Sequence, residues 1–114
     1  MKDDRVYLWH IRDCIRRIFS YTKDGKATFI ADTKTQDAVI RNLEIIGEAV
    51  KNISAELKKA YPDIPWRRIA GMRDRMIHEY FGVNLEVVWE RVERDVPELS
   101  QNVDRILSEL DKKI

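Results

Sequence analysis

Apolar residues recur along most of the chain at spacings of three and four, which is the periodicity of an amphipathic α-helix. Short polar or proline-containing stretches separate these apolar stripes. The pattern predicts an all-α fold, an antiparallel helical bundle of four to five helices of which four are the main ones. We expect residues 1–114 to form a single domain, because domain lengths cluster near about 100 to 150 residues.

The first half of the chain predicts two helices joined by a loop. The first helix is expected from about residue 4 to about residue 20, behind an acidic start that suits a helix N-terminus. Residues 22–35 contain the turn signal Asp24-Gly25 and predict a loop around a single helical turn. A second helix then carries the apolar seam Val39, Leu43, Ile46, Val50 and Ile53. Gly47 on the flank of this seam would let another helix approach closely.

The second half of the chain is divided by prolines. The stretch YPDIPW should stop helical propagation, and a new helix should begin near Pro65 and end near Phe81-Gly82. Asn84 is a plausible N-cap for the last helical region. In that region an apolar stripe runs to Leu110, and Pro97 is the expected place of a kink or break.

Composition narrows the chemistry. The formal net charge is +1, so no global basic field marks the chain as a nucleic-acid binder. One cysteine, Cys14, and two histidines, His10 and His78, are too few for a disulfide framework or a Cys/His zinc site. Neither a signal peptide nor a membrane span is expected, which favours a cytoplasmic protein without membrane contact.

Charge is concentrated in one segment, from Trp66 to Tyr80. In this segment, side chains that can carry a positive charge or donate a hydrogen bond outnumber the two carboxylates, Asp74 and Glu79. These side chains are Arg67, Arg68, Arg73, Arg75, His78 and Tyr80. A phosphate ester would find its best partner here. The sequence contains no phosphate-binding glycine loop, no metalloprotease motif and no nucleophile elbow, so this segment is the main candidate for a chemical site.

The spacing of this segment suggests how a site would form. Asp74 and His78 are four residues apart, so the carboxylate can orient the imidazole ring. Arg73 and His78 are five apart, about 140° around an ideal helix. They diverge at their Cα atoms, and both reach one substrate only if another helix or subunit closes a cleft beside them.

The residue types suit RNA cleavage. A neutral imidazole can take the proton from a ribose 2′-hydroxyl, and a guanidinium can hold the phosphate oxygens while negative charge builds up. The product would be a 2′,3′-cyclic phosphate, and no metal or other cofactor is needed.

Each of these residues also has a purely structural interpretation, without a role in RNA cleavage. His78 alone would more often be a surface or partly buried histidine, and Arg75 forms a ready ion pair with Glu79. The remaining candidates have similar alternatives: a solvated helix face for Arg67 and Arg68, a rim position for Tyr80, core or interface packing for Trp66, Phe81 and Trp89, and structural roles for His10 and Cys14.

The run Arg73-Asp74-Arg75-Met76-Ile77-His78-Glu79-Tyr80 resembles the R-x4-H-x-Y pattern of the HEPN superfamily, and within it the HepT-like ribonuclease toxins. The context agrees, because residues 45–54 and 61–99 are similar to the core of that family. The pattern R-x4-H alone is weak, whereas IPW-x5-MRDRMIHEY followed by a Val- and Trp-containing helix is specific.

The resemblance implies a homodimer in which the two Arg-His motifs meet in a cleft at the subunit interface. It implies an endoribonuclease toxin of a type VII-like toxin–antitoxin pair, with an MntA-like nucleotidyltransferase as the antitoxin partner. By position, Arg73 would bind phosphate, His78 would be the acid/base, Asp74 would support the site, and Tyr80 would be modified with AMP. Arg67 and Arg68 are further candidates for RNA-phosphate contacts.

Two other functions stay open at this point. The chain could be a non-catalytic HEPN module that assembles with a nucleotidyltransferase, or a plain helical interaction domain. The Arg73-His78 pair favours the enzyme. An apolar surplus around Val83 to Trp89 gives limited support to an interface with a partner.

Overall fold

The computed structural model describes residues 3–72 and 84–112. The described residues are helical and contain no strand, in agreement with the predicted all-α class. In chain order the helices are α1 (Asp4–Tyr21), α2 (Lys26–Ala31), α3 (Thr33–Asn52), α4 (Ala55–Ala60), α5 (Trp66–Ala70), α7 (Leu85–Glu90), the π-helical turn η1 (Arg91–Asp95) and α8 (Val96–Lys112).

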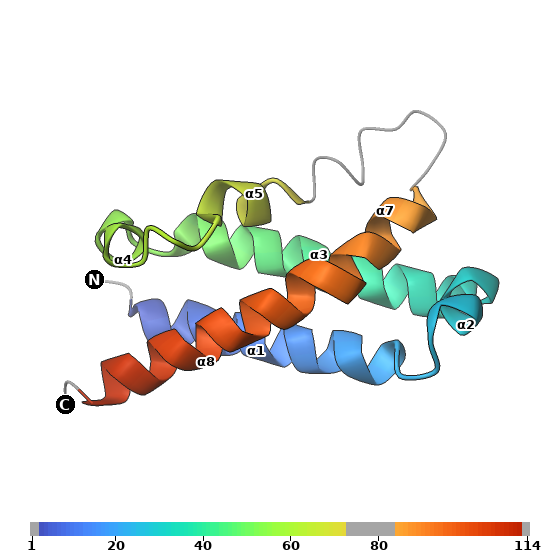
Figure 1. Ribbon diagram of the computed structural model, residues 1–114, viewed down its shortest axis with the longest axis horizontal. Helices are drawn as coiled ribbons and strands as arrows, with labels where there is room; N and C mark the ends of the chain where they lie inside the picture. Colours follow the sequence, from blue (N-terminus) through green and yellow to red (C-terminus); the bar gives the residue numbers. More distant parts are fainter. Residues whose placement is uncertain (1–2, 73–83, 113–114) are drawn as a thin grey trace.

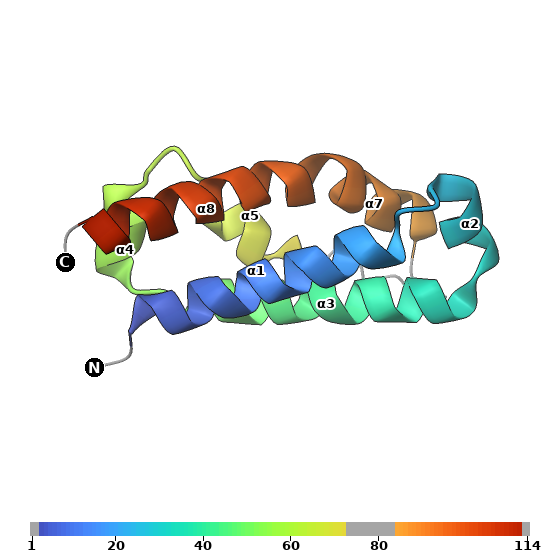
Figure 2. The ribbon, with the colours of Figure 1, turned by 90° about the horizontal axis from the view of Figure 1, so that it is seen from below.

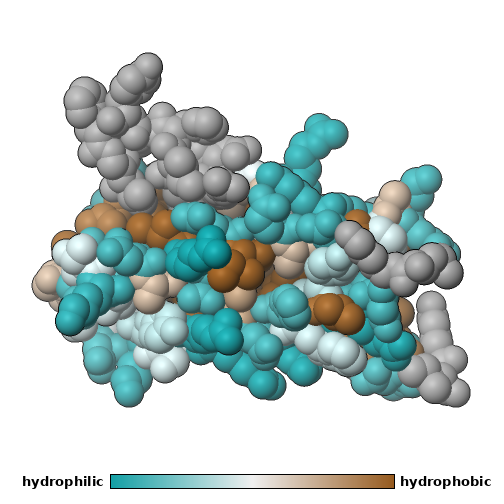
Figure 3. All heavy atoms as spheres, turned by 180° about the vertical axis from the view of Figure 1, so that it is seen from behind, coloured by the Kyte–Doolittle hydropathy of each residue, from teal (hydrophilic) through white to brown (hydrophobic). Residues whose placement is uncertain are grey.

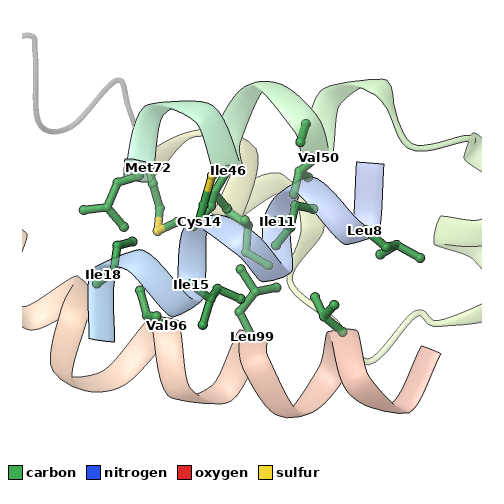
Figure 4. Packing of buried hydrophobic residues seen from close by; sticks show 14 of the residues in the cluster. Leu8, Ile11, Cys14, Ile15, Ile18, Ile46, Val50, Met72, Val96 and Leu99 are labelled. Carbon is green, nitrogen blue, oxygen red and sulfur yellow. The ribbon is translucent and has the colours of Figure 1, made fainter. Parts of the chain in front are cut away.

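The three longest helices, α1, α3 and α8, lie side by side along the length of the molecule (Figures 1 and 2). The colours show that α3 and α8 both run opposite to α1 and therefore in the same direction as each other, so the packing is antiparallel for the pairs that α1 forms. Their apolar stripes meet in one core, with side chains from α1 between those of the other two helices (Figure 4). Fully buried members include Leu8, Ile11, Ile15, Ile46 and Ile106.

The first helix begins and ends where its sequence predicts. The side chain of Asp3 accepts a hydrogen bond from the backbone N–H of Arg5 and so caps the first turn. Residues Leu8, Ile11 and Ile15 are completely or almost completely buried. Cys14 is also buried on this face, 1% exposed, in line with the structural role expected of it.

The predicted loop over 22–35 contains more helix than expected. Gly25 has a φ of 92° and precedes α2, a helix of 6 residues that buries Phe29. Asp32 then ends α2 and also caps α3, accepting from the N–H of Lys34 and the hydroxyl of Thr35. Because this cap lies at residue 32, α3 begins several residues before the apolar seam starts.

A short helix, α4, was not predicted. Ile53 leaves the helical conformation with φ −69° and ψ 139°, and the Ser54 hydroxyl accepts from the N–H of Leu57. Asp4 at the start of α1 accepts from both the N–H and the hydroxyl of Ser54. Six residues bury only Leu57, which is too little for an apolar periodicity to show in the sequence.

The helix predicted to begin near Pro65 does begin there, with Pro65 as the N-cap of α5. It ends at Ala70, whereas the sequence predicts a helix that continues to Phe81-Gly82. Gly71 forms a turn there: its N–H still donates to the carbonyl of Arg67, four residues back as in an α-helix, and Met72 is helical again. A glycine in a helix interior costs about 1 kcal/mol relative to alanine, which favours an end here. The rest of the predicted helix lies outside the described residues.

The last helical region begins at the predicted cap. The Asn84 side chain accepts from the N–H groups of Glu86 and Val87. Near Pro97 the sequence predicts a kink or break, and the structure has the π-helical turn η1 directly before it. The N–H of Val96 donates to the carbonyl of Arg91, five residues back. This wider turn accommodates the proline ring, and the helix continues as α8.

Three apolar residues of α7 pack on the core of the chain: Leu85, Val88 and Trp89. Val88 is fully buried, and the Trp89 ring lies against Phe29 of α2 with 5.4 Å between the ring centroids. Leu85, Val87 and Trp89 are half-buried, so an interface around Val83 to Trp89 stays a prediction; Val83 lies outside the described residues. Large apolar side chains that are exposed occur on α1 and α2, at Val6, Trp9, Phe19, Tyr21 and Ile30.

The surface seen from behind is mostly hydrophilic, with smaller apolar areas between polar side chains (Figure 3). No helix in the described ranges is both long and apolar enough to cross a membrane.

Candidate functional site

The structure describes how the chain approaches the motif, since α5 and Met72 directly precede Arg73. Ile69 and Met72 are buried in the core, 5% and 2% exposed. On the other side, α5 touches α3 at Gly47, where an added Cβ atom would lie 3.3 Å from the carbonyl oxygen of Ala70. The close helix approach predicted at Gly47 is confirmed, and it sets the place from which the motif starts.

A second anchor holds the segment ahead of α5. Nε1 of Trp66 donates to the carbonyl of Tyr61 at 3.0 Å. The Tyr61 hydroxyl donates to a carboxylate oxygen of Glu109 on α8 at 2.5 Å, and the Arg105 guanidinium lies 5.2 Å from the Tyr61 ring centroid. Burial, followed by the hydrogen bond to Glu109, raises the pKa of Tyr61 to about 12.

The third anchor is a group of three charged residues, the Arg68–Asp95–Arg91 cluster. Nη2 of Arg68 on α5 donates to Oδ1 of Asp95 at 2.9 Å. Nη1 of Arg91 donates to Oδ2 of the same carboxylate at 2.8 Å. One aspartate therefore binds an arginine from each of two elements and joins α5 to the end of η1.

Arg91 is buried, unlike most arginines. Its side chain is 4% exposed, and that of Asp95 is 13% exposed. A buried charge needs a partner, because removing the partner leaves an uncompensated ion in a medium of low polarity. Nε of Arg91 has no hydrogen-bond partner within the part of the chain that the structure describes, so Asp95 carries the pairing.

The predicted site residues fall into two groups. Arg73, Asp74, His78 and Tyr80 lie outside the described residues, as do Arg75, Glu79 and Phe81.

Arg67 and Arg68 lie on α5 and differ in their surroundings. Arg67 is exposed and forms no hydrogen bond or ion pair with a described residue, whereas Arg68 is paired with Asp95. A phosphate that bound Arg68 would compete with this carboxylate.

The space beside α5 is small. A cavity of about 20 Å³ lies between α5 and the start of α8 and is lined by residues that include Arg68, Met72, Asp95 and Leu99. It has room for a single water molecule and none for a nucleotide. The described side chains contain no group of three or more His, Cys, Asp or Glu residues placed to hold a metal ion.

The chain leaves the motif segment at the Asn84 cap of α7. This end is held to α2 by the contact between Trp89 and Phe29 and by an exposed ion pair between Lys26 and Glu86 at 2.7 Å. Trp66 and Trp89 both pack against the core, as their structural interpretation predicts.

Sequence reasoning assigned no role to Arg91 or Asp95. The pair has the (i, i+4) spacing of a helical ion pair, which is a usable signal. Nothing in the sequence indicates that Arg91 would be buried or that Asp95 would also bind Arg68.

Comparison with known protein families gives a match that includes the motif region. The sequence model of the family described as "Ribonuclease HepT-like" matches residues 11–106, a range that contains the whole Arg73-to-Tyr80 run. The chain belongs to the HepT-like ribonuclease family of the HEPN superfamily.

Several relatives carry ribonuclease names. The chain is 46% identical over 106 residues to a probable ribonuclease HepT of Thermococcus cleftensis, covering 92% of this chain and 96% of that protein. It is 44% identical over 108 residues to a putative RNase of Caldanaerobacter subterraneus subsp. tengcongensis, covering 94% and 96%.

A third relative, named gamma-glutamylcyclotransferase and putative RNase, comes from Methanocaldococcus jannaschii. The identity is 47% over 112 residues, and the match covers 97% of this chain but 50% of the relative. The chain therefore corresponds to half of that longer protein. No solved structure gives a significant match.

Proposed function

We propose that the protein is a metal-independent endoribonuclease that cleaves RNA by attack of a ribose 2′-hydroxyl on the adjacent phosphate. The observation that carries the proposal is the position of the R-x4-H-x-Y run, from Arg73 to Tyr80, inside the match to the HepT-like ribonuclease family. Ribonuclease names among relatives that align over most of the chain support RNA as the substrate.

In this proposal His78 takes the proton from the 2′-hydroxyl, and Arg73 neutralises the phosphate oxygens as the bond to the leaving 5′-oxygen breaks. The proton taken up by His78 is then given to the leaving 5′-oxygen, which becomes a hydroxyl. Asp74 orients His78. The products are one strand ending in a 2′,3′-cyclic phosphate and one beginning with a 5′-hydroxyl. Arg67, exposed and without a partner among the described residues, supplies a phosphate contact outside the reacting bond.

The proposed assembly is a homodimer whose two motifs share a cleft. A second subunit would resolve the divergence of about 140° between Arg73 and His78 on an ideal helix. Sedimentation equilibrium measures the assembly directly, and a monomer at assay concentrations would contradict a shared cleft.

The proposed physiological role is that of a toxin in a type VII-like toxin–antitoxin pair. An MntA-like nucleotidyltransferase would transfer AMP to the Tyr80 hydroxyl with release of pyrophosphate from ATP. The added bulk and negative charge beside the cleft would exclude RNA phosphate.

Two experiments test these proposals. Purified protein is expected to cut RNA in the presence of EDTA, and His78→Ala and Arg73→Ala are expected to abolish cutting while circular dichroism shows unchanged helicity. Cleavage by His78→Ala at the unsubstituted rate would overturn the assignment.

Growth arrest distinguishes the toxin from a non-catalytic partner of a nucleotidyltransferase. Expression of the unsubstituted chain should stop bacterial growth, and expression of His78→Ala should not. Equal tolerance of both chains would favour a non-catalytic module. Co-expression of the nucleotidyltransferase should restore growth and increase the mass of the chain by one AMP group, and Tyr80→Phe should show no such increase.

A further inference from the structure

The position of α5 depends on ties to the rest of the molecule. A helix of 5 residues is far below the length of about 12 to 15 residues at which isolated helices become even marginally stable. Two of its ties are apolar or steric, namely burial of Ile69 and the approach of Ala70 to Gly47. The pairing of Arg68 with Asp95 is its one ion pair with a described residue.

Asp95 is a fixed acceptor because of Arg91. The Arg91 side chain is 4% exposed, so loss of its carboxylate partner would leave a buried, unpaired cation. Oδ2 of Asp95 is thus held by Nη1 of Arg91, and Oδ1 remains available to Arg68. The two arginines use different oxygens and do not compete.

This geometry acts on the motif through the backbone. Arg68 lies five residues before Arg73, and Met72 in between is buried. A movement of α5 would therefore move the point from which the motif starts. Catalytic rates respond strongly to such shifts, since a misplacement of about 1 Å can cost roughly 100-fold.

We propose that Asp95 is a positioning residue that, seated on buried Arg91, fixes α5 through Arg68 and thereby sets where the chain enters the Arg73-to-Tyr80 motif. The effect on RNA cleavage rests on the proposed function. The attachment of α5 to Asp95 does not.

The test uses Arg68→Gln, Asp95→Asn and the double variant in the full chain. Asp63→Asn is the matched control. Like Asp95, Asp63 accepts from an arginine at 2.9 Å, in this case Arg105 of α8, but this pair is exposed. Two quantities are measured. The first is kcat and KM for RNA cleavage. The second is hydrogen exchange of the Ile69 and Gly71 amides, whose N–H groups donate to the carbonyls of Pro65 and Arg67 and so close the two ends of α5.

Positioning predicts that Arg68→Gln and Asp95→Asn each lower kcat by about 10-fold to 100-fold with little change in KM. The double variant should be no slower than the slower single variant, because both changes break the same tie. Exchange of the two α5 amides should accelerate by about tenfold, and Asp63→Asn should leave both measurements near those of the unsubstituted protein.

A direct RNA contact by Arg68 predicts a different pattern. Arg68→Gln would then raise KM, whereas Asp95→Asn would release Arg68 and lower KM. Such opposite shifts with unchanged kcat would overturn the proposal, as would unchanged amide exchange in both single variants.

Arg68→Gln keeps the buried Arg91–Asp95 pair, so it decides the question even if Asp95→Asn fails to fold. If the unsubstituted protein cleaves no RNA, the proposed function fails and amide exchange alone decides. Faster exchange in Arg68→Gln than in Asp63→Asn would support the attachment of α5 to Asp95, and equal exchange would overturn it.

Discussion

A Cβ atom at Gly47 would lie 3.3 Å from the carbonyl oxygen of Ala70, so α3 and α5 meet at nearly backbone-to-backbone distance. The position accepts glycine because any side chain points at an oxygen of the neighbouring helix. This relationship connects α3, the longest of the described helices, to the segment that precedes the motif.

Substitution of Gly47 tests this contact. Gly47→Ala gains about 1 kcal/mol of helix propensity and loses a similar amount by crowding Ala70, so the free energy of unfolding should change by about 1 kcal/mol or less. Gly47→Leu must displace α5 and should cost about 1 to 3 kcal/mol. Urea denaturation measures both, with exposed Arg41→Leu on the same helix as the control. A Gly47→Leu protein as stable as the control would contradict the close approach.

The buried thiol of Cys14 gives a second prediction. Desolvation by burial is the largest influence on this group and raises the pKa of the Cys14 thiol, which disfavours the reactive thiolate. Alkylation by iodoacetamide at pH 8 should therefore be slow in the folded protein and fast in urea. Since Cys14 is the only cysteine, the total label reports on it alone. Equal rates in the two conditions would show that the α1 face is not buried.

The raised pKa of Tyr61 predicts a loss of stability at alkaline pH. Burial raises its pKa to about 12 from an ordinary value of 10.0, so the folded state favours the protonated phenol. The stabilisation is complete below about pH 10 and is lost as the pH rises through about 12. Chemical denaturation of Tyr61→Phe and of the unsubstituted chain across this range measures it.

In Tyr61→Phe the alkaline loss should be smaller, because the residue no longer titrates. Spectrophotometric titration provides the control, as one of the 4 tyrosines should ionise near pH 12 only in the unsubstituted chain. Identical alkaline profiles for the two proteins would contradict the hydrogen bond to Glu109.

The side chain of Asn84 caps α7, the helix that follows the motif, and a substitution there measures how much this cap contributes to the free energy of unfolding. Its side chain accepts from two backbone N–H groups, so Asn84→Ala should lower the free energy of unfolding by about 0.5 to 2 kcal/mol. Asn84→Asp keeps an acceptor and should retain most of that stability. Thermal unfolding of the two variants measures the difference, and equal losses would contradict a stabilising role of the side-chain acceptor at this position.

The long helices could be predicted from sequence because each buries a full apolar stripe. Leu8, Ile11 and Ile15 mark α1, and Asn84 marks the start of α7 through its cap. Short helices were harder: α4 buries one residue, so its cap at Ser54 carries the information that a stripe usually does. α5 ends at Ala70 because glycine follows at position 71. The apolar spacing continues past this glycine, so the prediction from spacing placed no helix end there.

The candidate site is a different case. Arg73 and His78 are predicted from residue types and from the family resemblance; the family match spans both positions, and their roles stay a prediction. The Arg68–Asp95–Arg91 cluster could not be found in this way. Arg68 and Asp95 are 27 residues apart in the sequence, and only the packing of α5 against the end of η1 brings them together.

The central claim is that a ribose 2′-hydroxyl acts as the nucleophile with His78 as its base. The most direct measurement uses an RNA that the purified protein cuts in EDTA and a copy with a single 2′-deoxy ribose at the cut site. The expected result is a 2′,3′-cyclic phosphate end from the first RNA, no cutting of the second at that position, and no cutting of either by His78→Ala. Cleavage of the 2′-deoxy position at the same rate would contradict it.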